Sequence, residues 1–115
     1  MNVKVSKGGN ASVRLQVRTT PELVGIFVGA DEAYLMPADA VRLWRVLEGE
    51  SIGARVPMAV RSNIPGSILS VLYKDPYWVV ESEEKQLAEL NCDEALALGW
   101  AIKDAVVQIV GGCHE

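Results

Sequence analysis

The sequence is poor in the residue types from which catalytic and metal sites are usually built. Its 115 residues include one histidine, and His114 stands beside Cys113 in the C-terminal stretch GGCHE. Two adjacent ligands are fewer than the four that a structural zinc site needs. A histidine so close to a chain end also has little to hold it in place as a general base. We therefore predict a non-enzymatic protein with no metal site and no cofactor.

Disulfide bonds and targeting segments are also missing from the pattern. Two cysteines are too few for a disulfide framework, which favours a reducing, cytoplasmic location. The first ten residues, MNVKVSKGGN, lack the apolar stretch of a secretory signal, and Lys103 and Asp104 interrupt the longest apolar run. We expect a cytoplasmic protein that has no membrane among its partners.

Charge is unevenly distributed along a chain whose composition is otherwise that of a compact domain. Half of the residues are hydrophobic and 23% are charged, which excludes a disordered chain. The net charge of −4 divides into +1 for residues 1–49 and −5 for residues 50–115. Because charge attraction dominates the binding of polyanions, we expect any anionic partner to meet the first half.

Alternating apolar and polar residues predict strands in both halves. Val13, Leu15 and Val17 fall on one face of a strand, and Arg14, Gln16 and Arg18 fall on the other. The expected strands are 2–6, 12–18, 23–28, 33–36, 56–61, 67–73, 77–82 and 86–90. A helix should open at Pro37 and end near Gly49, and another should run from an Asn91-x-x-Glu94 capping box to about Val110.

The two halves share one order of elements at an offset of 55 residues. Seven identities fall in 37 aligned positions, among them Ala33 with Ala88 and Leu43 with Leu98. We predict an α+β fold made of two ββββα repeats, 1–49 and 56–111, joined by a linker at 50–55 and related by a pseudo-twofold axis. The 115 residues then form one domain. Chance agreement between two α+β halves is the alternative.

The second helix is apolar on two sides. Ala95, Leu98 and Ile102 form a core stripe, whereas Leu96, Trp100 and Val107 cluster on the far side. On the sixth strand Leu69 and Val71 occupy positions that are polar in the second strand. We predict that these residues cover an interface, which is either between the two helices of one chain or between the subunits of a homodimer. The predicted interface residues are Leu96, Trp100, Val107, Leu69 and Val71.

The stretches VKVSKGGNASVRLQV and AYLMPADAVRLWRVLEG carry a resemblance to known proteins. The first stretch is a basic antiparallel pair, and the second is a short strand followed by an apolar helix that starts at a proline. This arrangement resembles the ββββα modules of the Whirly, Pur-alpha-type and positive-cofactor-four-type coactivator families. The resemblance implies curved sheets that bind single-stranded DNA or RNA through basic and aromatic side chains, with helices that pack the modules together.

Single-strand binding requires a basic groove with aromatic groups on which bases stack. The candidate nucleic-acid-binding residues are Lys4, Lys7, Arg14, Gln16, Arg18, Tyr73 and Tyr77. Two other functions remain open. The chain could be a homodimeric protein–protein interaction module, such as an adaptor or a small inhibitor of a larger protein machine, that uses the apolar second helix. It could also hold a small molecule in a pocket near Trp44, Trp78 and Trp100.

Two further features have a structural and a chemical reading. Cys92 falls at the start of the second helix, where a thiolate is stabilised, but a small residue also suits the position that Pro37 holds in the first half. The run ESEEK at 81–85 could hold a hard cation or form a solvated turn, and we expect the turn.

Overall fold

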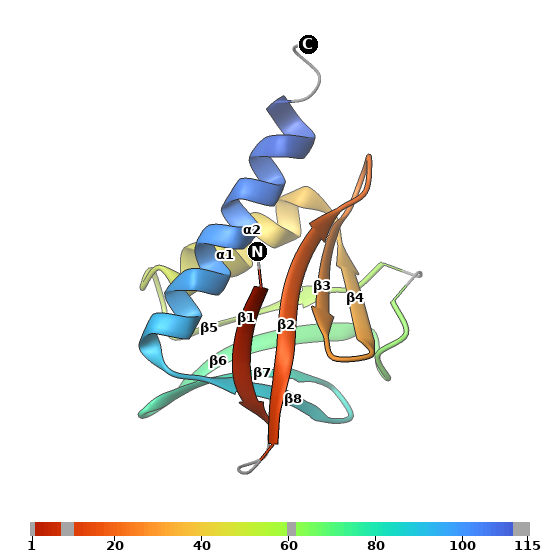
Figure 1. Ribbon diagram of the computed structural model, residues 1–115. Helices are drawn as coiled ribbons and strands as arrows, with labels where there is room; N and C mark the ends of the chain where they lie inside the picture. Colours follow the sequence, from red (N-terminus) through yellow and green to blue (C-terminus); the bar gives the residue numbers. More distant parts are fainter. Residues whose placement is uncertain (1, 8–10, 60–61, 112–115) are drawn as a thin grey trace.

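The computed structural model describes residues 2–7, 11–59 and 62–111, and for 2–7 and 11–14 it describes the backbone. The chain is α+β, as predicted: antiparallel strands and two helices follow one another in the order ββββα and then ββββα (Figure 1). The first four strands and their helix are β1 (Asn2–Lys7), β2 (Ala11–Thr19), β3 (Val24–Val28), β4 (Asp31–Leu35) and α1 (Pro37–Leu47). The remaining elements are β5 (Gly53–Pro57), β6 (Ile68–Lys74), β7 (Tyr77–Ser82), β8 (Gln86–Leu90) and α2 (Cys92–Gly111).

Neighbouring strands pair antiparallel in the spatial order β4-β3-β2-β1-β8-β7-β6-β5. Within each group of four the ladders are extended, but β1 and β8 share a single pair, Ser6 with Glu89. In Figure 1 the strands β1 and β2 accordingly run across the direction of β5 to β8. Within the described residues, the β1–β8 junction itself is therefore held by very little backbone hydrogen bonding.

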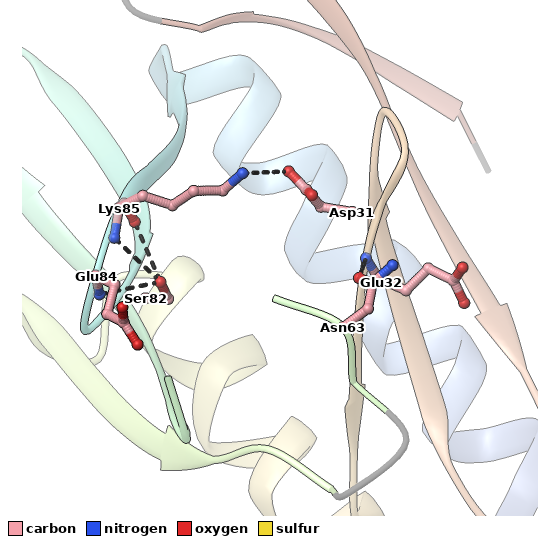
Figure 2. A network of polar contacts seen from close by, with 6 residues as sticks. All are labelled: Asp31, Glu32, Asn63, Ser82, Glu84 and Lys85. Atoms are coloured by element: carbon pink, nitrogen blue, oxygen red, sulfur yellow. Dashed lines mark hydrogen bonds and ion pairs between the residues drawn. The ribbon is translucent and has the colours of Figure 1, made fainter. Parts of the chain in front are cut away.

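The segment that follows β5 covers the outer edge of β4. The backbone N–H of Ala59 donates to the Tyr34 carbonyl at 2.7 Å, and the N–H of Asn63 donates to the Glu32 carbonyl at 3.0 Å. In return, the N–H of Glu32 donates to Asn63 Oδ1 at 2.7 Å (Figure 2). These bonds satisfy backbone groups that would otherwise form an open sheet edge.

Both helices begin and end as the sequence predicts. Pro37 occupies the first turn of α1, and Gly49, with a φ of 101°, donates its N–H to the Val46 carbonyl just beyond the helix end. At the start of α2, the N–H of Glu94 donates to Asn91 Oδ1 at 2.8 Å and the N–H of Asn91 donates to Glu94 Oε1 at 2.9 Å. The predicted capping box is confirmed. No helix in the described part of the chain is long and apolar enough to cross a membrane.

A single apolar core lies between the strands and the two helices. The largest fully buried side chains are Leu15, Ile26, Leu35, Leu43, Leu69, Leu87, Leu90, Leu98, Ile102, Val24 and Val28. The helices meet closely at Gly99, where an added Cβ would lie 3.2 Å from the Cβ of Leu47 and 3.6 Å from the Trp44 carbonyl oxygen. The missing side chain at Gly99 therefore sets the distance between α1 and α2.

The main error in the predicted elements is the position of β5. The prediction was a strand at 56–61 after a linker at 50–55, whereas the strand is Gly53–Pro57 and pairs with β6 from Gly53 opposite Leu72 to Pro57 opposite Ile68. The reason is that the chain from Ala59 onward leaves β6 and pairs with β4 instead. Residues 60–61 lie outside the described residues. Strand β4 also starts earlier than predicted, at Asp31.

Burial predicts how strongly single substitutions in α2 and at the surface change stability. Leu98 is 1% exposed in the core, so Leu98→Ala should lower the free energy of unfolding by about 2–5 kcal/mol through lost burial and a residual cavity. Ile52 is 77% exposed, so Ile52→Ala should change it by about 0.5 kcal/mol or less. Urea unfolding followed by circular dichroism measures both values. Equal losses in the two variants would contradict this core assignment.

Candidate functional site

The structure places the predicted nucleic-acid-binding residues in two separate regions. Lys4 is paired with Arg14, and Asn2 with Gln16, in the β1–β2 ladder. Lys7 and Ala11 close that ladder. Tyr73 and Tyr77, both exposed, lie instead beside the turn that joins β6 and β7. The hydroxyl of Tyr73 donates to Asp75 Oδ1 at 2.8 Å, and this hydrogen bond raises the pKa of the phenol. The basic residues and the tyrosines therefore belong to two different strand pairs.

An aromatic residue that was not predicted lies beside Gln16 and Arg18. Arg18 Nη2 donates to Gln16 Oε1 at 3.1 Å, and its guanidinium lies 5.2 Å from the centre of the Phe27 ring. Phe27 in turn contacts the Tyr34 ring edge to face, with the centroids 5.8 Å apart. We call Gln16, Arg18, Phe27 and Tyr34 the aromatic rung. Both rings lie over Gly25, where an added Cβ would meet the Phe27 ring at 2.8 Å.

The predicted interface residues divide into exposed and buried ones. On α2, Leu96, Trp100 and Val107 are 36%, 52% and 57% exposed, and Val110 is 56% exposed. Together with Lys103 they recur at spacings of four, three, four and three residues, which places them on one side of the helix. We call this set the α2 stripe. Its C-terminal part belongs to the end of α2 that extends beyond the strands in Figure 1.

Leu69 and Val71 are covered within the chain, which agrees with the intramolecular alternative and not with an interface between subunits. Both side chains are 1% exposed and belong to the core of the chain itself. The register explains why: Leu69 and Val71 pair with Val56 and Ala54 of β5 and share the side of the sheet that faces the helices. Neither side chain has exposed surface that a partner could contact.

A basic groove that the sequence analysis missed lies between α1 and the β5–β6 pair. Its main hollow has a volume of about 570 Å³, and a neighbouring cavity of about 270 Å³ shares Arg42, Gly53 and Ala54 with it. We define the basic groove by its cations, Arg42 and Arg45 of α1, Arg55 of β5 and Lys74 of β6. Its remaining lining is Ile52, Gly53, Ala54, Leu72, Tyr73, Val46, Glu50 and Ser51.

Few carboxylates lie near the basic groove, and those that face its cations do so only at long ion-pair distances. Asp39 Oδ1 lies 3.9 Å from Arg42 Nη1, and Glu81 Oε2 lies 3.8 Å from Lys74 Nζ. Exposed pairs at these distances contribute little and leave the cations hydrated. Glu50 is the one acidic residue that lines either of the two cavities. The groove is therefore electropositive in a protein whose net charge is −4.

The acidic run at 81–85 joins distant parts of the chain. Lys85 Nζ lies 2.9 Å from Asp31 Oδ2 and so ties the β7–β8 turn to the β3–β4 turn (Figure 2). Within the run, Ser82 Oγ accepts hydrogen bonds from the N–H groups of Glu84 and Lys85, both at 3.2 Å. The described residues contain no group of three or more His, Cys, Asp or Glu side chains that could hold a metal ion.

The structure also locates the thiol at the start of α2 and the three tryptophans. Cys92 is an exposed free thiol at the first residue of α2, and His114 and Cys113 lie outside the described residues. Trp44, Trp78 and Trp100 have different surroundings: Trp78 is buried against Tyr73, the centre of the Trp44 ring lies 5.4 Å from Lys103 Nζ, and Trp100 is exposed.

Comparison with known proteins gives no relative for this chain. No family model, no curated protein and no solved structure matches it. The aromatic rung, the α2 stripe and the basic groove are therefore the features of the chain from which a function can be inferred.

Glu83, a neighbour of Arg55, accepts hydrogen bonds from Ser67, so its contribution to the stability of the fold depends on pH. The Ser67 N–H and hydroxyl donate to Glu83 Oε1 at 2.7 and 3.0 Å, and with a smaller contribution from Arg55 they lower the pKa of this carboxyl. Since the pKa is lower in the folded state, the stabilisation is present above the ordinary glutamate pKa and is lost as the pH falls through the folded value.

Ser67→Ala should therefore raise the pKa of Glu83 toward its ordinary value in an NMR titration. Ser51→Ala is the matched control, because Ser51 bonds to Gly53 and not to Glu83. A pKa of Glu83 that is the same in the wild type and in Ser67→Ala would contradict the assignment.

Proposed function

We propose that the protein is a non-catalytic interaction module that forms a homodimer through the α2 stripe. The observation that carries this proposal is the exposure of four large apolar side chains along one side of a helix. Contiguous apolar surface of this kind marks interaction sites in soluble proteins, and tryptophan is enriched among the residues that dominate binding energy. Trp100 would be the principal anchor.

A second copy of the chain fits the α2 stripe because the stripe is self-complementary. Read backwards, its spacing of four, three, four and three becomes three, four, three and four, so an antiparallel copy centred on Lys103 brings Leu96 of one chain beside Val110 of the other and sets Trp100 close to Val107. Lys103 lies at the centre, where the antiparallel pair would bring the two lysines close together, and its Nζ lies 5.4 Å from the centre of the Trp44 ring of its own chain. A twofold interface requires this kind of self-matching patch.

Light scattering on purified protein tests the homodimer. The wild type should show twice the chain mass over a concentration series, and Trp100→Glu should reduce it to the mass of one chain because it buries a charge in the interface. Gln108→Glu adds the same charge to an exposed position on another side of α2 and should remain dimeric. Circular dichroism should show the same fold in all three. A wild type that stays monomeric at every concentration would falsify the proposal.

Single-stranded nucleic acid is the second candidate ligand, and the aromatic rung is the observation that favours it. The half-buried ring of Phe27 lies next to an exposed arginine on the strand that also carries Arg14. A base that stacks on Phe27 with its phosphate near Arg18 would use contacts typical of single-strand binding. Phe27 thus takes the stacking role that the sequence analysis gave to Tyr73 and Tyr77.

Fluorescence anisotropy with a labelled thymidine oligonucleotide tests this candidate at low and moderate salt. Arg18→Glu should weaken binding by about tenfold or more, because a phosphate contact is replaced by repulsion. Arg45→Glu makes the same change of charge on α1 and should leave binding through the aromatic rung intact. If both variants lose binding equally, or if the wild type does not bind at low salt, the nucleic-acid candidate fails.

We also propose that the two halves are repeats related by a pseudo-twofold axis. Two observations support this: Gln86 follows Asp31, and Cys92 follows Pro37, by the same 55 positions, and the strand order β4-β3-β2-β1 of the first half is repeated as β8-β7-β6-β5 in the second. The earlier strands do not keep this offset, since β3 starts at residue 24 and β7 at residue 77. The proposal is therefore one of shared descent with a later change of register.

A further inference from the structure

We infer that the basic groove and the adjacent edge of β5 bind an acidic peptide in extended conformation, which joins the sheet as an additional strand. This site is separate from the α2 stripe and from the aromatic rung. Its elements are a strand edge, a set of cations and an apolar surface, and each of them constrains the ligand.

The backbone of β5 has one side that is open to a further strand. Strand β5 ends the spatial order of the sheet. The N–H of Tyr73 donates to the Ile52 carbonyl and the N–H of Met58 donates to the Ser67 carbonyl, so the backbone groups of residues 52, 54, 56 and 58 point toward β6. Those of Gly53, Arg55 and Pro57 consequently point away from the sheet.

Arg55 provides the complete donor and acceptor pair on this open side. Gly53 is engaged by the Ser51 hydroxyl, which lies 3.1 Å from the Gly53 carbonyl oxygen and 3.4 Å from its nitrogen, and Pro57 has a carbonyl but no N–H. No hydrogen bond within the described residues uses the N–H or the carbonyl of Arg55. An extended peptide could therefore exchange two backbone hydrogen bonds with Arg55 and one with the Pro57 carbonyl, as in other cases of strand addition.

The charges next to this edge select an acidic peptide. Arg42, Arg55 and Lys74 line the larger hollow together, and no carboxylate lines it with them. A peptide on the β5 edge would run between α1 and β5, where Arg45 adds a fourth cation. Glutamate or aspartate at alternate positions would then meet guanidinium groups, which bind carboxylates through paired hydrogen bonds.

Apolar side chains in the groove can contact the peptide residues that lie between the acidic ones. Ile52 is largely exposed, and the half-buried Leu72 and exposed Tyr73 line the same hollow. Because successive side chains of a strand alternate in direction, a peptide that alternates acidic and apolar residues can contact the cations and this apolar surface together. A small inorganic anion would use the cations but neither the apolar surface nor the strand edge.

NMR chemical-shift mapping on the labelled full chain tests the site with a synthetic octapeptide of alternating glutamate and valine. The largest shifts should fall on the amides of Arg55 and its neighbours in β5 and on the end of α1 near Arg45. A peptide with lysine in place of glutamate should bind at least about tenfold more weakly, since it reverses every charge contact. A glutamate–valine peptide that is N-methylated at its central residues should lose a similar factor, because it cannot donate to the Arg55 carbonyl.

Variants of Arg55 separate the charge from the backbone. Arg55→Ala removes the cation and keeps the N–H, whereas Arg55→Pro removes both, and proline is tolerated where an edge strand faces outward. Binding should weaken in Arg55→Ala and weaken further in Arg55→Pro. Trp100→Glu, which tests the homodimer, should bind the peptide as the wild type does, so the two proposals can fail separately.

Several results would overturn the inference. Equal binding of the N-methylated and unmethylated peptides would exclude strand addition, even if Arg55→Pro did not fold. Pyrophosphate that shifts the same amides at a similar concentration would indicate a small-anion site. Tighter binding of a thymidine oligonucleotide at these residues would indicate a nucleic-acid site, and the absence of shifts in β5 would leave no peptide site there.

Discussion

The packing of α2 against α1 and across the strands is the interaction on which the rest of this structure depends. The two groups of four strands share one ladder pair, Ser6 with Glu89, and backbone hydrogen bonding at that junction is too sparse to fix their orientation. The shared core fixes it instead, with Leu98 and Ile102 of α2 and Leu43 of α1 fully buried within it. Gly99 allows this close approach, and Lys85 with Asp31 adds a polar tie at the opposite side.

Helix α2 lies at the centre of the core, so packing restricts which residues it can carry on its buried side but not on its exposed side. Residues of α2 that touch the sheet and α1 must be apolar and of fitting size. The apolar residues of the α2 stripe, Leu96, Trp100, Val107 and Val110, are exposed, although charged residues suit an exposed helix face. Core packing does not explain this composition, which is why we assign it to a second chain.

Local signals made much of the fold predictable. Pro37, Gly49 and the pair Asn91 and Glu94 mark helix ends through chemistry that acts within a few residues, and the structure confirms each of them. Strand β5 was misplaced because its position depends on which distant strand each residue pairs with. Alternation in VPMAVR is compatible with a strand, but Ala59 pairs with Tyr34 of the first half, and no local pattern reports that choice.

The candidate sites were less predictable than the fold because they are assembled from distant residues. Arg42, Arg55 and Lys74 stand far apart in the sequence and meet only because α1 packs next to β5. Phe27 was overlooked, although Gly25 two positions before it is a signal of a side chain that lies across the backbone. Helical spacing is a local property, so it placed Leu96, Trp100 and Val107 together on one side of α2, where the structure shows them exposed, but Val110 was not predicted. For Leu69 and Val71 the sequence left open whether the chain itself or a second subunit covers them, because the period of a strand does not say what packs on its apolar face.

The covered edge of β4 limits how copies of this sheet can associate. A sheet can grow from chain to chain only if every chain has two open strand edges, one that pairs with the preceding chain and one that pairs with the next. The bonds from Ala59 and Asn63 to β4 close one of them, and the edge of β5 is short and ends in a proline. Growth by edge pairing can therefore add one strand or one further copy and then stops, so the protein can use an open strand for recognition without the risk of forming fibres.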